Sequence, residues 1–454
     1  MLSKSSKLTS ILQKILWIYL FLNPLIDFAT GFYLCEFLGV SELDIQNYTF
    51  ASTPGLYIRM FMLLLFTLYL LLRFDKPAIV TMLAMGLAWA ASIAVLLLSG
   101  TELQLGIDIK YFVKYCYNVV MMFAYVSVFV SCWDDRKMLM RKIRTLISYT
   151  CLVYSFAIII PYCLQVGYFT YADRLGYRGS RGYFTSANDV TAVFVILLPL
   201  AIAMLLDMDR ELKFGEKLIR YITPAFSIVT MCLIGSKTAF LAAGFTMVVM
   251  LIASLVSKNG NRGRKLLRFL IMFLIILLIF LLLCVFVGKD KIINDIYDSL
   301  IAPFLFAWNE DVETAVLSGR DNKLKKQFGM FRDGGIRTLL FGIGRSTVDL
   351  IIEMDICEVV IYYGLLAAVV MLWIYVFLGI EFFIGFFKKR GLISFALFIG
   401  IGLATGYLVI SGHVLFTVTS GQYFVLAIAL SRLLFSDTAE QLAVKPIAHL
   451  KKAK

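Results

Sequence analysis

The sequence contains few charged residues, few prolines and almost no histidine. Only 16% of its 454 residues are charged and 61% are hydrophobic, whereas an ordinary soluble domain has about 25% charged residues. A soluble chain could not hide so many apolar side chains from water, so the composition excludes a globular cytosolic enzyme, a disordered tail and a secreted disulfide-rich domain. With 2 histidines, and with 8 cysteines scattered singly along the chain, the sequence offers neither the ligands of a zinc site nor a disulfide framework.

Long hydrophobic runs dominate what is present. Runs of roughly 17–25 residues cross a bilayer as a helix. Such runs lie at residues 11–34, 55–73, 77–99, 108–132, 145–167, 189–206, 219–235, 238–257, 268–288, 352–379, 392–411 and 414–435. They predict an all-α, polytopic integral membrane protein with about 12 transmembrane helices. The first run is too long for a cleavable signal peptide and contains Asn23, Pro24 and Asp27, which favours a permanent first span.

The net charge of +13 is explained by membrane topology. If the N-terminus lies in the cytoplasm, about two thirds of the basic residues but only a third of the acidic ones fall in cytoplasmic connections. This asymmetry follows the positive-inside rule, and an even number of spans then places both termini in the cytoplasm. The excess of basic residues therefore does not indicate a nucleic-acid partner.

Most connections between the runs are short, so residues 1–454 are predicted to form a single membrane domain. The exception is residues 289–351, a segment of about 60 residues that is much longer than ordinary connections. We predict that it is an extracytoplasmic loop with short helices inside it, because stretches such as 292–306 are amphipathic. A second polar segment, 168–189, falls on the same face of the membrane.

Charged residues from distant parts of the sequence converge on this outer face. The candidate cations are Lys110, Lys114, Arg174, Arg178, Arg181, Lys237 and Arg345, and the candidate general bases are Glu353, Asp355 and His413. Cations at fixed positions bind a diphosphate and stabilise the charge that develops on it as a leaving group. A carboxylate or a histidine takes the proton of an attacking sugar hydroxyl. Together they indicate glycosyl transfer from a lipid diphosphate, with no metal or other cofactor.

Several of these residues also have a structural interpretation. Arg174 and Arg178 would then contact the phosphates of surrounding lipids. Lys110 and Lys114 share one face of a helix and would extend to the lipid headgroups. Asp27, deep in the first span, would pair with another residue inside the protein or organise a kink.

The candidates lie in short motifs that follow one another along the chain. The motifs are Arg181-Gly182-Tyr183-Phe184-Thr185-Ser186-Ala187-Asn188, Gly235-Ser236-Lys237-Thr238-Ala239, Ser318-Gly319-Arg320, Phe341-Gly342-Ile343-Gly344, Glu353-Met354-Asp355 with Tyr363-Gly364, and Ser411-Gly412-His413. Their order resembles that of the O-antigen ligase and O-antigen polymerase superfamily. Where Gram-negative ligases carry a His-Asn pair, this chain has Glu353-Met354-Asp355. The identity of the general base therefore stays open between Glu353, Asp355 and His413.

The resemblance implies a type-C-like glycosyltransferase architecture in the bacterial cytoplasmic membrane. The donor would be an undecaprenyl-diphosphate-linked glycan, and the acceptor either another lipid-linked repeat (polymerase) or a different surface carrier (ligase). The product would be capsule, exopolysaccharide or a similar polymer, made alongside other polysaccharide-assembly proteins. Asn188 and Arg320 would have structural or substrate-positioning roles. The alternative function is a lipid-linked oligosaccharide flippase or another transporter, whose charges would line a cavity open in turn to both faces.

Overall fold

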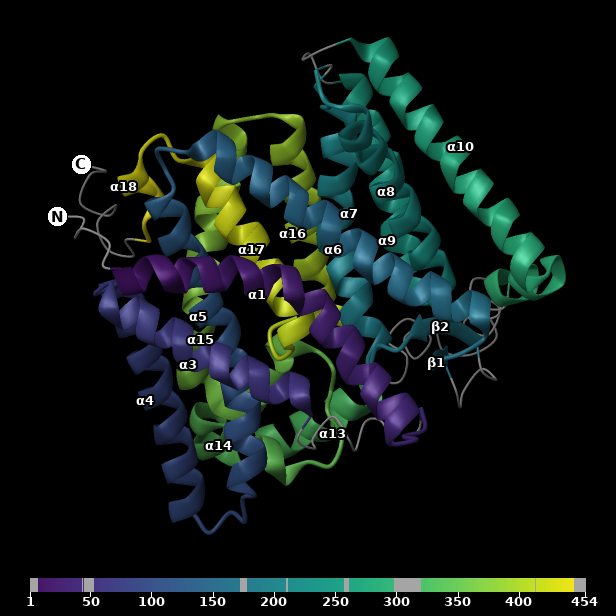
Figure 1. Cartoon of the computed structure of the whole chain (residues 1–454). Helices are drawn as coiled ribbons and strands as arrows, with labels where there is room; N and C mark the ends of the chain where they lie inside the picture. The colour runs from purple at the N-terminus through teal and green to yellow at the C-terminus, as the bar shows by residue number, and fades with distance from the viewer. Residues whose placement is uncertain are drawn as a thin grey trace.

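The computed structural model describes residues 7–42, 44, 53–171, 178–209, 211–256, 261–297, 320–412 and 414–444. Within these residues the chain folds into a bundle of helices (Figure 1). Arg174 and His413, two residues of the predicted site, lie outside the described residues, as do residues 298–319 of the long predicted loop.

Among the described residues, 12 helices are long and apolar enough to cross a membrane. They are α1 (Lys7–Phe32, continued by the π-helix η1, Tyr33–Phe37), α3 (Pro54–Leu72), α4 (Lys76–Leu98), α5 (Leu105–Ser131), α6 (Arg136–Leu164), α7 (Ala187–Leu206), α8 (Phe214–Ile234), α9 (Lys237–Val256), α10 (Arg262–Val287), α15 (Asp355–Lys388), α16 (Leu392–Ile410) and α17 (Val418–Phe435). Each corresponds to one hydrophobic run, so the prediction of an all-α polytopic protein is confirmed.

Shorter elements fill several of the connections. They are the strands β1 (Tyr168–Tyr171) and β2 (Arg178–Gly182), the helices α13 (Arg320–Asp333), α14 (Gly335–Phe341) and α18 (Ala439–Leu442), and the 3-10 turn η2 (Arg345–Thr347). The two strands form an antiparallel hairpin that the sequence analysis did not predict. The described parts of the long segment 289–351 contain α13, α14 and a helical stretch at 289–297.

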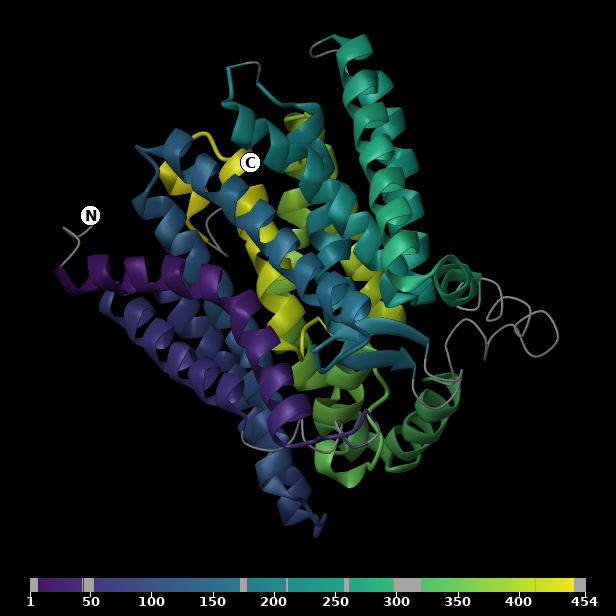
Figure 2. The same ribbon diagram turned by 45° about the vertical axis from the view of Figure 1, so that its right-hand side comes forward.

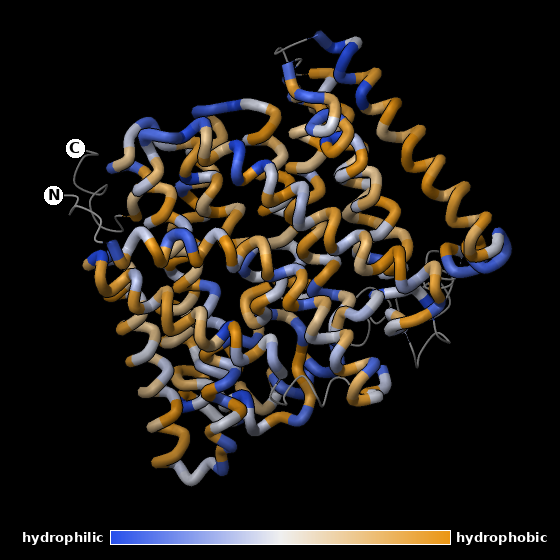
Figure 3. Tube along the Cα trace, viewed as in Figure 1, coloured by the Kyte–Doolittle hydropathy of each residue, from blue (hydrophilic) through white to orange (hydrophobic). Residues whose placement is uncertain are grey.

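The hairpin and the helices of the long segment lie at one end of the bundle. The hairpin, α13 and α14 share one end, whereas the connections from α7 to α8 and from α15 to α16 lie at the other end (Figures 1 and 2). Hydrophobic residues line the helices between the two ends, as α10 shows most clearly (Figure 3). This distribution is the one expected of a protein whose middle layer is surrounded by lipid.

The helix α7 forms the centre of the bundle. It packs against α16, α8, α17 and α9, and every residue in it is buried except Asn188 and Asp189 in its first turn. Ser186 caps this end of the helix, where its hydroxyl accepts the Asp189 N–H at 3.2 Å. The most enclosed helix of the bundle therefore presents polar side chains only at its N-terminus.

The helix α15 is broken at Gly364, where the backbone is not helical (φ 79°, ψ 169°). The break frees carbonyl groups, and the Gly-rich segment after α14 satisfies two of them. Ile343 N–H donates to the Ile361 carbonyl and Gly344 N–H donates to the Tyr362 carbonyl, both at 3.0 Å. Unpaired carbonyls are costly at membrane depth. The Gly-rich segment therefore stabilises the broken helix by supplying the missing hydrogen-bond donors.

Candidate functional site

Of the two described candidate bases, Glu353 is the accessible one. Its side chain is 25% exposed and forms an ion pair with Arg320, with 2.7 Å between Oε2 and Nη2. Lys323 Nζ lies 3.6 Å from the other carboxylate oxygen. Both cations belong to α13, so this short helix brings Arg320 directly to a candidate base.

The backbone of Glu353 is held in an unusual conformation. Its φ is 66°, a left-handed value that costs a residue with a side chain about 1–3 kcal/mol. Two neighbours hold it there. Glu353 N–H donates to Glu358 Oε1 at 2.7 Å, and Gly412 packs so closely that a Cβ on it would lie 2.6 Å from the Glu353 carbonyl. Strained residues of this kind cluster at functional sites.

Asp355 is buried and holds the segment before α17. Only 2% of the residue is exposed, and its Oδ2 accepts the N–H groups of Val414 (2.8 Å) and Leu415 (2.7 Å). Asn118 of α5 supports the same segment, because its amide donates to the Leu415 carbonyl at 2.8 Å. These contacts favour a structural role for Asp355.

Tyr407 of α16 connects the ends of α7 and α9. Its hydroxyl donates to the Asn188 carbonyl at 3.2 Å and also lies beside Thr238. Lys237, the first residue of α9, precedes Thr238 and is half-buried. The turn before it needs Gly235, whose φ is 71°. Tyr407 therefore brings the start of α7 close to the start of α9, where Thr238 directly follows Lys237.

The hairpin adds another predicted cation to this region. Arg178 of β2 pairs with Tyr171 of β1, and Arg320 lies within electrostatic range of both Tyr171 and Tyr407. We refer to Arg178, Lys237, Arg320, Glu353 and Tyr407 as the Glu353 cluster. It joins the hairpin with α9, α13, α16 and the loop before α15.

Lys110 and Lys114 lie elsewhere, in a cavity of about 240 Å³ between α3 and α5 that Arg59 also lines. Asp189 lies within electrostatic range of both Lys114 and Tyr407. Asp189 therefore lies between the cavity and the Glu353 cluster in electrostatic terms, because it acts on a residue of each. Neither Arg59 nor Asp189 was among the residues predicted from the sequence.

Two of the predicted cations are buried inside the protein. Arg345 is 4% exposed and lies 5.7 Å from the ring of Tyr111 and 5.8 Å from that of Tyr362. Arg181 is 9% exposed and lies 5.3 Å from the ring of Tyr168. Burial lowers the pKa of Arg181 to about 10, so it keeps its charge at neutral pH. These surroundings favour packing roles for both residues over direct contact with a substrate.

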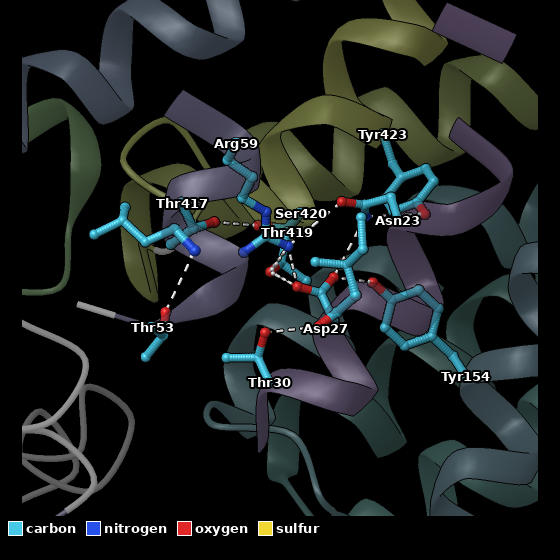
Figure 4. Close-up of polar contacts among 12 residues, drawn as sticks. Asn23, Asp27, Thr30, Thr53, Arg59, Tyr154, Thr417, Thr419, Ser420 and Tyr423 are labelled. Carbon is cyan, nitrogen blue, oxygen red and sulfur yellow. Dashed lines mark hydrogen bonds and ion pairs between the residues drawn. The ribbon is translucent and has the colours of Figure 1, made fainter. Parts of the chain in front are cut away.

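Asp27 was expected either to organise a kink or to pair inside the protein, and the structure shows the pairing. Its carboxylate forms an ion pair with Arg59 of α3 and accepts the hydroxyls of Tyr154 (2.6 Å) and Thr419 (3.0 Å). Figure 4 shows these side chains converging from four helices. In the sequence, this network is indicated only by the presence of a carboxylate inside a hydrophobic run. A charge at membrane depth requires a partner.

The arrangement combines an accessible carboxylate with several cations at one end of the bundle. Such a set can bind an anion such as a diphosphate and can accept a proton from a hydroxyl beside it. Among the described residues, no group of three or more His, Cys, Asp or Glu side chains is placed to hold a metal ion.

Comparison with known proteins identifies the family. The family model described as O-antigen ligase like membrane protein matches residues 9–294, well over half of the chain. Comparisons with curated proteins and with solved structures give no match. The matched region contains Asn188, Lys237 and the two cavity lysines, and it ends before α13. The chain therefore belongs to the O-antigen ligase-like membrane proteins, a family of membrane-embedded polysaccharide ligases and polymerases.

Proposed function

We propose that this protein transfers a glycan from undecaprenyl diphosphate to a sugar hydroxyl at the outer face of the bacterial cytoplasmic membrane. The observation that carries the proposal is the accessible carboxylate of Glu353, held in a strained conformation and paired with Arg320. Strain of this kind is retained where function requires a fixed geometry. Membership of the ligase and polymerase family supports the reaction class.

In the proposed reaction the acceptor hydroxyl attacks the anomeric carbon of the donor sugar. A new carbon–oxygen bond forms, the bond from that carbon to the diphosphate oxygen breaks, and undecaprenyl diphosphate leaves with the electron pair. Glu353 accepts the proton of the hydroxyl. Lys237, Arg178 and Arg320 offset the charge on the departing diphosphate, so the reaction proceeds without a metal.

We assign the base to Glu353 rather than to Asp355. Asp355 is 2% exposed and accepts two backbone N–H groups of the protein at less than 3 Å, whereas the Glu353 side chain is 25% exposed, so a substrate hydroxyl can approach Glu353 and not Asp355. His413 remains the second candidate. It lies outside the described residues, so the assignment between Glu353 and His413 rests on the transfer assay of their variants.

The distribution of charge supports the outer-face location. The Glu353 cluster lies at the end with the hairpin and α13, while connections rich in Lys and Arg, such as the one before α8, lie at the opposite end (Figures 1 and 2). By the positive-inside rule the latter end faces the cytoplasm, together with both termini. Segment 289–351 is then the extracytoplasmic loop.

The proposal is tested by incubating the purified protein with undecaprenyl-diphosphate-linked oligosaccharide repeats. A ladder of lengthening products identifies a polymerase, and transfer to a different carrier identifies a ligase. Lys237→Ala should abolish product and Lys237→Arg should retain part of it, because a diphosphate accepts either cation with different geometry. Lys213→Ala, an exposed lysine at the opposite end of the bundle, is the matched control. Absence of transfer to any acceptor would contradict the proposal and favour a flippase.

A further inference from the structure

The cavity between α3 and α5 combines cations with an aliphatic wall. It is lined by Leu56, Arg59, Met60, Leu63, Gly106, Ile109, Lys110, Val113, Lys114, Tyr117 and Val418. Three of these residues are cations, and no carboxylate is among the described residues that line it. The lining includes Met60 of α3 and Ile109 of α5, each 45% exposed.

The cations of this cavity lie well below the ends of their helices. Arg59 is five residues after Pro54, where α3 begins, and Lys114 is nine residues after Leu105, where α5 begins. At a rise of 1.5 Å per residue, they lie roughly 7 Å and 14 Å along the helix axes. Charge at such depth marks a site for a partner or a ligand of opposite sign.

The guanidinium of Arg59 is anchored at Nη2, which donates to Asp27, Asn23 and Thr419. Tyr19 also lies within hydrogen-bonding range of this guanidinium, and Nε is buried away from the cavity. The Arg59 side chain is still 14% exposed and lines the cavity. Nη1, which none of the Nη2 hydrogen bonds uses, is therefore left to contact a ligand there.

Asp27 fixes the anchored side. The Tyr154 hydroxyl donates to its Oδ2 at 2.6 Å and the Thr419 hydroxyl to its Oδ1 at 3.0 Å, so residues from α6 and α17 hold the carboxylate that holds Arg59 (Figure 4). Only 7% of the Asp27 side chain is exposed. A guanidinium held in this way is preorganised for an anion, since few rotamers are lost when the ligand binds.

We propose that this cavity binds the diphosphate of a polyprenyl diphosphate lipid that enters from the bilayer between α3 and α5. On entry, before the diphosphate reaches the Glu353 cluster, Arg59, Lys110 and Lys114 contact the two phosphates. The first isoprene units then lie against Met60 and Ile109. Asp27 is a positioning residue that acts through Arg59. The inference rests on the proposed function for the identity of the lipid, and it adds a residue and an entry path that the Glu353 cluster does not contain.

The binding test uses the purified full-length protein in detergent micelles with undecaprenyl diphosphate, undecaprenol, inorganic pyrophosphate and phosphatidylglycerol as separate probes. Undecaprenyl diphosphate should bind most tightly, because it alone supplies both the headgroup and the chain. Arg59→Gln should raise its Kd roughly 10- to 100-fold, the range for a lost hydrogen bond to a charged group. Arg59→Lys should recover part of the affinity. Arg73→Gln, at the other end of α3, is the control.

The role of Asp27 is tested by non-additivity. Asp27→Asn should weaken binding of undecaprenyl diphosphate, and should raise KM for the lipid-linked donor more than it lowers kcat. In the Arg59→Gln background the same change should add little, whereas a merely structural Asp27 would weaken binding additively. If Asp27→Asn does not fold, Lys110→Gln and Lys114→Gln test the cavity without touching the Asp27 network.

Several outcomes would overturn the inference. They are wild-type affinity in Arg59→Gln, equal competition by phosphatidylglycerol, and undecaprenol binding as tightly as the diphosphate. The two proposals fail separately. If the wild-type protein transfers no glycan but Arg59→Gln loses diphosphate binding, the proposed reaction is wrong and the proposed binding site stands. If Arg59→Gln binds the diphosphate and transfers glycan normally, the proposed binding site is wrong and the proposed reaction stands.

Discussion

Replacing Asp355 by alanine should destabilise the protein without touching the reacting groups. The carboxylate is buried, and its removal leaves the N–H groups of Val414 and Leu415 without their acceptor. Each unsatisfied buried donor costs about 1–3 kcal/mol, so the loss should be about 2–6 kcal/mol. That is a large share of the stability of a typical protein, which is about 5–15 kcal/mol.

Glu353→Gln should reduce glycan transfer while leaving the stability of the protein nearly unchanged. The Glu353 side chain is 25% exposed, and partly exposed ion pairs such as the one with Arg320 contribute little, about 0–1 kcal/mol. Stability should therefore stay close to that of the wild type. Glutamine cannot accept the proton, so single-turnover transfer with saturating donor should fall roughly 10²–10⁴-fold.

The two variants are compared by thermal unfolding in detergent and by single-turnover transfer in the same preparation. Asp349→Asn, an exposed acid in the same loop, is the control and should change neither quantity. If Asp355→Ala unfolds at the wild-type temperature, the structural role assigned to Asp355 is wrong. If Glu353→Gln transfers glycan at the wild-type rate, another residue is the base, and His413→Gln becomes the decisive variant.

Three further predictions concern other parts of the molecule. Gly364→Ala should lower thermal stability by roughly 1–3 kcal/mol or more, because the φ is 79° and a Cβ would lie 2.3 Å from the Leu340 carbonyl; Gly379→Ala, in open space on the same helix, should not. Treatment with EDTA should leave transfer unchanged, since Lys and Arg side chains offset the leaving-group charge; a loss that Mg²⁺ restores would contradict this. Asn118→Ala and Asp355→Ala should be non-additive in stability, because both support Leu415.

The membrane spans could be predicted from the sequence because their signal is local. A run of apolar residues long enough to cross a bilayer can form few structures other than a helix, and each run in this chain did so. The hairpin of β1 and β2 could not be found in the same way. Its strands are 4 and 5 residues long, lie in a polar segment and show no clear alternation of apolar residues.

The candidate site could be predicted only in part, because side-chain pairing is not local. Arg320 and Glu353 were both selected, yet their contact depends on how α13 folds back onto the loop before α15. Asp27 was recognised as a residue in need of a partner, but its partner Arg59 lies 32 residues away on another helix. Nothing in the pattern around Arg59 distinguished it from a residue that extends to lipid headgroups.

Motifs shared with a family also do not separate chemistry from architecture. The Gly-rich segment after α14 drew attention as part of a site, but it satisfies the carbonyls that the break at Gly364 exposes. Arg345, directly after that segment, is enclosed by tyrosine rings. Both features keep the broken helix and its loop in one conformation, and the geometry of Glu353 depends on that loop.

The charged residues near the membrane-spanning helices fall into two groups that differ in their surroundings. Asp27 and Asp355 lie inside the protein, where Arg59 and backbone N–H groups satisfy them. Lys110 and Lys114 line a cavity with aliphatic walls, and Asp189 lies within electrostatic range of Lys114. Evolution can retain the first group for folding alone, whereas cations grouped around a cavity at depth are retained more readily when an anion occupies it. Arg59 belongs to both groups, so one buried network would connect the stability of the bundle to the proposed binding of a lipid diphosphate.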